Sequence, residues 1–96
     1  MAYYVYILTN KNKTVFYTGF TNNLKHRVKQ HEMGKVNGFS KKYNCYYLLY
    51  YEKHEDYAGA ILREKQVKKF GRRKKFALIE AFNPDWRFLN DEDGIG

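Results

Sequence analysis

Residues 2–8 read AYYVYIL and residues 14–20 read TVFYTGF, and these two stretches decide the fold. The first is apolar or aromatic on both alternating faces, which is typical of a central strand that is buried on both sides. The second is rich in β-branched and aromatic residues, which favour strands. Only a short polar connection, Asn10 to Lys13, separates them. We therefore expect the two strands to form an antiparallel β-hairpin.

Beyond the hairpin, the sequence predicts helices and one more strand. The side chains of Thr21, Asn22 and Asn23 can cap a first helix, and Glu55 or Asp56 can cap a second. The expected elements are strands at 2–8, 14–20 and 45–52, a polar loop at 34–44, and helices at 23–33, 55–70 and 72–82. The order β-β-α-β-α-α predicts an α+β fold, with a three-stranded, mainly antiparallel sheet and flanking helices.

The length of 96 residues predicts a single domain, which we place at residues 1–89. Residues 90–96 are acidic and contain glycine, and we expect them to form a disordered tail. One cysteine and three histidines supply no dense zinc-ligand pattern; we interpret Cys45 as a small buried residue and His26 and His54 as surface residues. No signal peptide or long apolar run is evident, so we expect a cytoplasmic protein.

The charge balance indicates an anionic partner. The chain carries 18 lysine and arginine residues against 10 acidic ones, a formal net charge of +8, and seven of the eleven residues from 65 to 75 are basic. Like charges so closely spaced repel each other, and a polyanion relieves that repulsion. Membrane binding is disfavoured because the basic run lacks a matching broad hydrophobic face. We expect nucleic acid, contacted by Lys68, Lys69, Arg72, Arg73, Lys74 and Lys75.

Five polar or small residues have the spacing that phosphodiester hydrolysis requires. That reaction needs groups that orient or deprotonate water, neutralise charge on the phosphate and hold a metal ion. Tyr6 and Tyr17 lie on adjacent strands of the expected hairpin and so come close in space. Gly19, at the strand-to-helix connection, would let a phosphate approach the backbone. Arg27 and His31 are spaced i, i+4 on the first helix and project together, with Arg27 as a planar phosphate clamp.

Glu64 is the carboxylate best placed to hold a metal. On the second helix, Tyr57, Ile61, Glu64 and Lys68 fall on one stripe, which puts Glu64 at the border of the buried face. Carboxylate oxygens are the ligands that Mg²⁺ and Mn²⁺ prefer. Because only one carboxylate is well placed, the pattern favours one divalent ion over a two-metal site.

Several short segments together resemble a known nuclease family. They are Tyr4-Val5-Tyr6, Tyr17-Thr18-Gly19, Thr21-Asn22-Asn23-Leu24, Arg27, His31 and the helical segment from Arg63 to Lys69. In this spacing, over residues 3–79, they resemble the GIY-YIG nucleases, in particular the small, stand-alone bacterial branch. The incision nuclease of bacterial excision repair and the homing endonucleases carry the same domain with extra DNA-binding modules. Two positions depart from the motifs, with Tyr4 in place of glycine and Thr18 in place of isoleucine.

The resemblance implies a metal-dependent endonuclease that acts on nucleic acid, with DNA favoured over RNA and RNA left open, and that leaves 5′-phosphate and 3′-hydroxyl ends. It implies that one Mg²⁺ or Mn²⁺ ion is the cofactor. Family members also often use a late asparagine, for which Asn83 is the candidate here. The implied roles are orientation or deprotonation of water for Tyr6 and Tyr17, phosphate binding for Arg27, proton transfer for His31 and metal binding for Glu64.

Each of these residues also has an ordinary structural interpretation. Tyrosines in strands most often pack in a core, and His31 at the border of an apolar face serves structure as readily as catalysis. Glu64 can form a surface pair with Lys65 or Lys68, and the basic run can be a solvated helix face. The competing function is therefore a non-catalytic nucleic-acid-binding module that acts with a partner protein.

Overall fold

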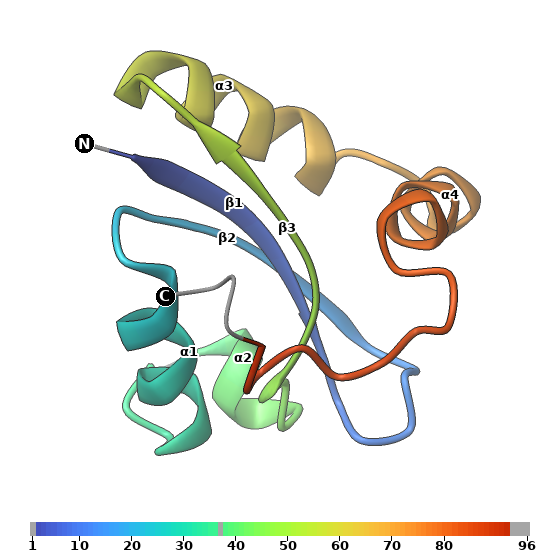
Figure 1. Cartoon of the computed structure of the whole chain (residues 1–96). Coiled ribbons are helices and arrows are strands. Elements are labelled where there is room, and N and C mark those ends of the chain that lie inside the picture. Colours follow the sequence, from blue (N-terminus) through green and yellow to red (C-terminus); the bar gives the residue numbers. More distant parts are fainter. Residues whose placement is uncertain (1, 37, 93–96) are drawn as a thin grey trace.

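The computed structural model of the chain describes residues 2–36 and 38–92 and has the predicted α+β architecture, an antiparallel sheet flanked by helices (Figure 1). In chain order the elements are β1 (Tyr3–Thr9), β2 (Phe16–Thr21), α1 (Leu24–Glu32), α2 (Phe39–Lys42), β3 (Tyr47–His54), α3 (Tyr57–Lys68) and α4 (Arg72–Phe82).

β1 is the middle strand of the sheet, whose order is β2-β1-β3 (Figure 1). It pairs antiparallel with both neighbours, and its residues from Val5 to Thr9 are all buried. This is the arrangement that the two-sided apolar pattern of AYYVYIL predicts, because helices cover both faces of the strand. β2 is consequently an edge strand.

The register brings Tyr6 of β1 opposite Gly19 of β2. The Tyr6 ring lies over that glycine so closely that a Cβ built on Gly19 would be 2.4 Å from the Tyr6 hydroxyl oxygen. Only a residue without a side chain allows this contact. The glycine therefore fixes the position of the Tyr6 hydroxyl group near the free edge of the sheet.

The two faces of the sheet carry two separate hydrophobic clusters. On one face, Tyr6 and Leu8 of β1 pack with Leu24 and Val28 of α1. On the other face, Val5 and Ile7 of β1 pack in a cluster with Leu49, Tyr50, Val67 and Ile79, which lie on β3, α3 and α4. Cys45 is fully buried in the first cluster, as predicted. Alternate residues of β1 thus anchor helices on opposite faces.

The helix starts follow the predicted capping residues. The Asn23 side chain accepts a hydrogen bond from the His26 backbone N–H, and Asp56, rather than Glu55, caps α3 by accepting from Gly59. One element was not predicted. The segment expected to be a polar loop contains the short helix α2, whose residue Ser40 is buried beneath it.

The C-terminal segment is anchored to the start of β3 through Leu89 and Asn90. The Asn90 side chain accepts from the Leu48 backbone N–H and donates to the Tyr46 carbonyl and to the Glu32 carboxylate. Asn90 is the first residue of the expected disordered tail, and residues 93–96 of that tail lie outside the described residues. None of the helices in the described ranges has the length and apolarity needed to span a bilayer.

Candidate active site at the edge strand β2

A buried chain of hydrogen bonds runs from β1 through α1 to α2. The Tyr6 hydroxyl is 3.1 Å from Nε2 of His31, and Nδ1 of His31 is 2.6 Å from the Ser40 hydroxyl. All three side chains are at most 1% exposed. Ser40 was missed from the sequence because it lies in the segment expected to be a loop, where no spacing rule links it to His31.

His31 is held neutral at this position. Burial and the positive charge of Arg27 lower the pKa of His31 from 6.5 to about 4. A neutral imidazole has one N–H and one free nitrogen. In one tautomer, the Tyr6 hydroxyl donates to Nε2 and the N–H at Nδ1 donates to the Ser40 hydroxyl oxygen. In the other tautomer, the N–H at Nε2 donates to the Tyr6 oxygen and the Ser40 hydroxyl donates to Nδ1. The three groups thus form a path along which a proton can move.

Four of the predicted residues surround the Tyr6 hydroxyl group. Burial raises the pKa of Tyr6 above its ordinary value; Arg27 opposes this shift, whereas Tyr17 and Glu64 add to it. The Tyr6 and Tyr17 ring centroids are 6.4 Å apart, and those of Tyr17 and His31 are 5.2 Å apart. The structure therefore brings Tyr6, Tyr17, Arg27, His31 and Glu64 into one cluster, which we call the Tyr6 cluster.

Arg27 carries an unsatisfied donor in this cluster. Its Nη1 donates to Oε1 of Gln30 at 3.2 Å, one turn along α1. Its Nε is buried and has no hydrogen-bond partner within the described part of the chain. A buried N–H without an acceptor is costly, and a phosphate oxygen is the acceptor that a guanidinium group matches best. Arg27 also lines an open cleft at one end of β2, and there its guanidinium group can meet a phosphate oxygen.

Glu64 lies at the border of the buried face of α3, as predicted, with its side chain 18% exposed. Its Oε2 is 3.2 Å from the Lys68 ammonium. Across residues 2–36 and 38–92, no three His, Cys, Asp or Glu side chains gather where they could together hold a metal. Mg²⁺ does not need such a cage, because it keeps several water ligands and binds through one or two carboxylates plus substrate phosphates. The donor set fits one such ion.

Asn83 lies outside the Tyr6 cluster, and its polar atoms are used within the fold. Its side-chain amide donates to the Leu49 carbonyl at 3.1 Å and to the Arg87 carbonyl at 2.8 Å, and its oxygen accepts from the Arg87 backbone N–H. The side chain is almost fully buried. Asn83 therefore holds the chain after α4 against β3, and we do not retain it as a candidate site residue.

The predicted nucleic-acid-binding run spans the end of α3 and the start of α4, and part of it contacts the protein itself. The Arg72 guanidinium lies 5.9 Å from the Phe16 ring centroid and 5.5 Å from that of Phe76. The Lys74 ammonium lies 4.4 Å from the centroid of Phe70. Such cation–π contacts orient the side chains without neutralising their charge.

The other members of the run differ in exposure. Lys69 and Arg73 are exposed, whereas Lys75 is half-buried and its pKa is lowered by that burial. Lys68 is exposed and pairs with Glu64. The run therefore presents its charges in several directions rather than as one flat surface, and its contact with nucleic acid stays a prediction.

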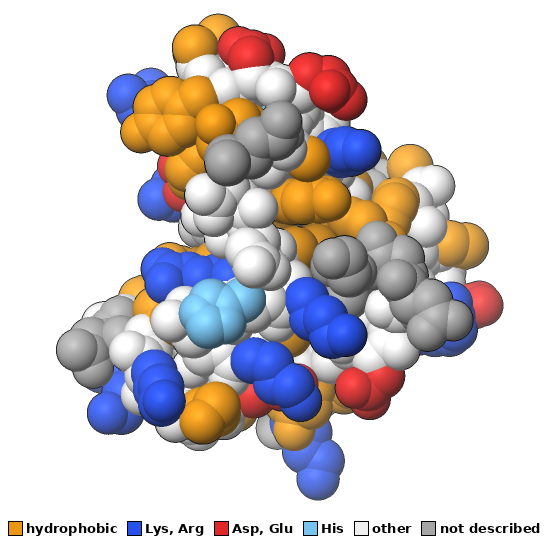
Figure 2. All heavy atoms as spheres, turned by 60° about the vertical axis from the view of Figure 1, so that its left-hand side comes forward, with side chains coloured by type: hydrophobic (Ala, Val, Ile, Leu, Met, Phe, Trp, Pro, Cys, Tyr) orange, Lys and Arg blue, Asp and Glu red, His pale blue; other side chains and the backbone are white. Residues whose placement is uncertain are grey.

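Two clefts lie at the two ends of β2. One, of about 290 Å³, we call the basic cleft; it is lined by Phe16, Phe39, Phe70, Phe76, Arg72 and Lys75. The other, of about 370 Å³, we call the aromatic cleft; it is lined by Tyr3, Phe20 and Tyr57 and by Asn23, His26 and Arg27 from the start of α1. Figure 2 shows the α1 side of the molecule, with lysine and arginine side chains around a histidine and hydrophobic side chains above an indentation.

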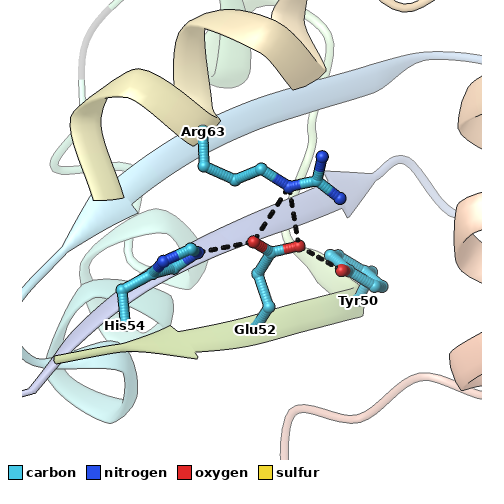
Figure 3. A network of polar contacts seen from close by, with 4 residues as sticks. All are labelled: Tyr50, Glu52, His54 and Arg63. Atoms are coloured by element: carbon cyan, nitrogen blue, oxygen red, sulfur yellow. Dashed lines mark hydrogen bonds and ion pairs between the residues drawn. The ribbon is translucent and has the colours of Figure 1, made fainter. Parts of the chain in front are cut away.

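A polar network fastens α3 to β3 next to Glu64 (Figure 3). Arg63 donates from Nε to both carboxylate oxygens of Glu52, at 3.2 and 3.0 Å, and Tyr50 and His54 also contact that carboxylate. Burial acts to raise the pKa of Glu52, but the hydrogen bonds from these partners hold it below its ordinary value. His54, predicted to be a surface residue, keeps its side chain 25% exposed and is held in this network.

Comparison with known proteins places this geometry in context. Residues 2–77 match the model of the GIY-YIG catalytic domain. A UPF0213 protein of Oceanobacillus iheyensis is 37% identical over 81% of this chain and 90% of its own length, and one of Syntrophus aciditrophicus is 37% identical over 85% and 93%. The solution NMR structure of a UPF0213 protein from Bacillus halodurans covers 90% of both chains, with 30% identity and a TM-score of 0.58.

Proposed function

The chain belongs to the GIY-YIG family of nuclease domains, and from this premise we propose that it is a metal-dependent endonuclease that hydrolyses phosphodiester bonds in nucleic acid, DNA rather than RNA. The observation that carries the proposal is the grouping of Tyr17, Arg27 and His31 around the buried hydroxyl of Tyr6, whose pKa also responds to the charge of Glu64. We place the enzyme in the cytoplasm, in agreement with the single free cysteine, which is buried.

Arg27 binds the scissile phosphate in this proposal. Arg27 lines the aromatic cleft, and a non-bridging phosphate oxygen bound there would accept hydrogen bonds from its guanidinium group. The guanidinium is permanently charged, so it stabilises the additional negative charge that develops on the phosphate during attack. Because Gln30 holds Nη1, the plane of the guanidinium is fixed before the substrate binds.

Tyr6 and Tyr17 orient the attacking water. The raised pKa of Tyr6 keeps its side chain a neutral phenol. The phenol oxygen can therefore accept a proton from water only if the phenol proton passes at the same time to Nε2 of His31. His31 is neutral and can accept that proton, while Ser40 holds the other ring nitrogen. The water oxygen then forms the new bond to phosphorus, and the bond from phosphorus to the 3′ oxygen breaks.

Glu64 would hold one Mg²⁺ or Mn²⁺ ion. The ion, when bound, neutralises charge on the phosphate and on the departing oxygen. To take that role, the Glu64 carboxylate would give up its contact with the exposed Lys68 ammonium. The departing 3′ oxygen takes up a proton, so the products are a 5′-phosphate and a 3′-hydroxyl.

A cleavage assay tests the proposal. Labelled single-stranded, duplex, nicked and branched DNA, and the matching RNAs, are incubated with the protein and Mg²⁺, Mn²⁺ or chelator. We expect metal-dependent cleavage that falls by about 10²–10³-fold in Arg27→Ala and Glu64→Gln. Matched controls are Lys25→Ala, an exposed cation on α1, and Glu80→Gln, an exposed carboxylate on α4, which should keep wild-type rates. Cleavage that persists in both site variants contradicts the proposal.

The Glu64–Lys68 ion pair favours a second candidate function, because a carboxylate neutralised by lysine is a poorer metal ligand. In that case the chain is a non-catalytic module that binds nucleic acid through its positive charge and acts with a partner protein. Its signature is salt-sensitive binding to nucleic acid without cleavage in the presence of any divalent metal.

A further inference from the structure

The aromatic cleft has a wall built from three mutually contacting rings. Tyr3 of β1 and Phe20 of β2 are stacked, with centroids 5.9 Å apart and an interplanar angle of 8°. Tyr57, at the first turn of α3, stands edge-on to both, at 5.8 and 5.5 Å. Tyr57 is 57% exposed, although the hydrophobic effect favours covering so large a ring. The cleft thus presents an aromatic surface to solvent.

The opposite wall of the cleft comes from the start of α1 and is polar. It includes Asn23, His26 and Arg27, the residue to which we assign the scissile phosphate. The cleft volume of about 370 Å³ is at the small end of the range of about 300–1,000 Å³ found for small-ligand sites. An occupant therefore needs a flat apolar face, polar edges and a negative charge beside Arg27.

We propose that the aromatic cleft binds one unstacked nucleobase of the nucleotide next to the scissile phosphate, so that the substrates are single-stranded or locally unpaired nucleic acid. The inference rests on the proposed function, because Arg27 fixes where the phosphate lies. A base stacks on Tyr57 through its π-face, and its edge meets the side chains at the start of α1.

The chemistry of the cleft favours a base over other apolar groups. An exposed aromatic ring accepts any of the bases, because each has a π-face, and it does so without reading sequence. A base within an intact duplex has both faces covered by its neighbours and cannot reach the ring unless it leaves the stack. The net charge of +8 and the guanidinium group of Arg27, a residue that lines the cleft, favour an occupant that carries a phosphate.

Binding measured in chelator tests this inference separately from cleavage. The probes are a short fluorescent single-stranded oligonucleotide, the same strand with abasic residues, and its duplex; the readout is anisotropy. We expect the wild type to bind the single strand in preference to the other two. Tyr57→Ala should weaken binding to the single strand by about 5- to 150-fold, the range for loss of one stacked base, whereas Tyr57→Phe should retain it.

Phe88→Ala is the matched control. Phe88 is a similarly exposed ring that stacks on Tyr47, at the other end of the sheet, and its loss should leave the affinity unchanged. The inference is overturned if Tyr57→Ala and the wild type have equal affinity for the single strand, and equal affinity for the duplex. It is also overturned by equal wild-type binding of normal and abasic strands, a result that needs no variant to fold. If base-dependent binding is found but no cleavage occurs with any metal, the proposed function fails and the cleft assignment stands.

Discussion

Two neighbours determine what the Tyr6 hydroxyl group can do. Gly19 leaves the space above β2 that the ring occupies, and His31 receives the hydroxyl at the other side. The phosphate-approach role predicted for Gly19 is untested, but the close contact with Tyr6 alone is enough to require glycine there. A buried phenol with a neutral imidazole beside it can pass a proton without creating a lasting charge inside the protein.

The histidine makes the stability of the fold depend on pH. The pKa of His31 is 6.5 unfolded and about 4 folded, so the unfolded chain binds one more proton between these values. The contribution of His31 to the free energy of unfolding is therefore fully present above pH 6.5, and it is lost as the pH falls toward 4. We expect His31 to account for about 3 kcal/mol of the free energy of unfolding lost over this interval. Urea denaturation at a series of pH values measures it.

Two variants separate this effect from the titration of carboxylates. His31→Asn removes the titrating group, so its free energy of unfolding should fall less steeply between pH 6.5 and 4. His26→Asn removes an exposed histidine from the same helix and should behave like the wild type. Parallel curves for His31→Asn and the wild type would mean that His31 is accessible to protons in the folded state.

At the scale of elements, α3 is the helix whose position matters most for the proposed chemistry. It carries Glu64 on one side and, one residue earlier, Arg63, which binds the Glu52 carboxylate of β3. Since Arg63 holds both oxygens of Glu52, the helix is fixed in rotation as well as in distance from the sheet. The network thus positions Glu64 without contacting the site.

Replacement of Glu52 by glutamine should loosen α3. The neutral amide cannot match the charged donor of Arg63, so we expect the free energy of unfolding to fall by about 1–3 kcal/mol. Amide hydrogen exchange in α3 should become faster. Glu92→Gln, which breaks the exposed pair with Arg87, is the matched control and should cost no more than about 1 kcal/mol. Equal losses in both variants would contradict the structural role of the network.

The elements that could be predicted from sequence are those that local signals specify. The hairpin follows from two apolar strands and a short polar connection, and α1 begins after a side chain that can cap it, Asn23. Helix α2 could not be predicted, since its four residues lie in a polar, glycine-containing segment. The hydrogen bond between Ser40 and His31, nine positions apart, is tertiary in origin.

The same distinction explains which site residues could be predicted. Arg27 and His31 follow from helical spacing, and Tyr6 and Tyr17 from the hairpin, so their proximity was accessible from sequence. The structural role of Asn83 could not be predicted from sequence, because its hydrogen-bond partner Leu49 is 34 positions away and belongs to another element. Asn83 matches the family's late asparagine by its position in the sequence, but its side chain bonds to Leu49 and Arg87 outside the Tyr6 cluster.

For the whole molecule, the free edge of the sheet is the feature that organises the proposed function. β2 lies at that edge, with the Tyr6 cluster beside its middle and a cleft at each end. A nucleic-acid strand that follows β2 would meet aromatic rings at one end and Arg72 and Lys75 at the other. In the proposed function, the positive net charge attracts such a strand, and the Tyr6 cluster between the clefts carries out the hydrolysis.

The central claim is that Glu64 holds a divalent ion beside Tyr6 and Tyr17, and paramagnetic broadening by Mn²⁺ tests it most directly. Mn²⁺ alone is titrated into the isotope-labelled protein while the tyrosine ring resonances are recorded. We predict that the Tyr6 and Tyr17 signals broaden first in the wild type and stay sharp in Glu64→Gln at the same Mn²⁺ concentration. Equal broadening in both proteins, or broadening confined to the acidic residues Asp91 and Glu92, would contradict the claim.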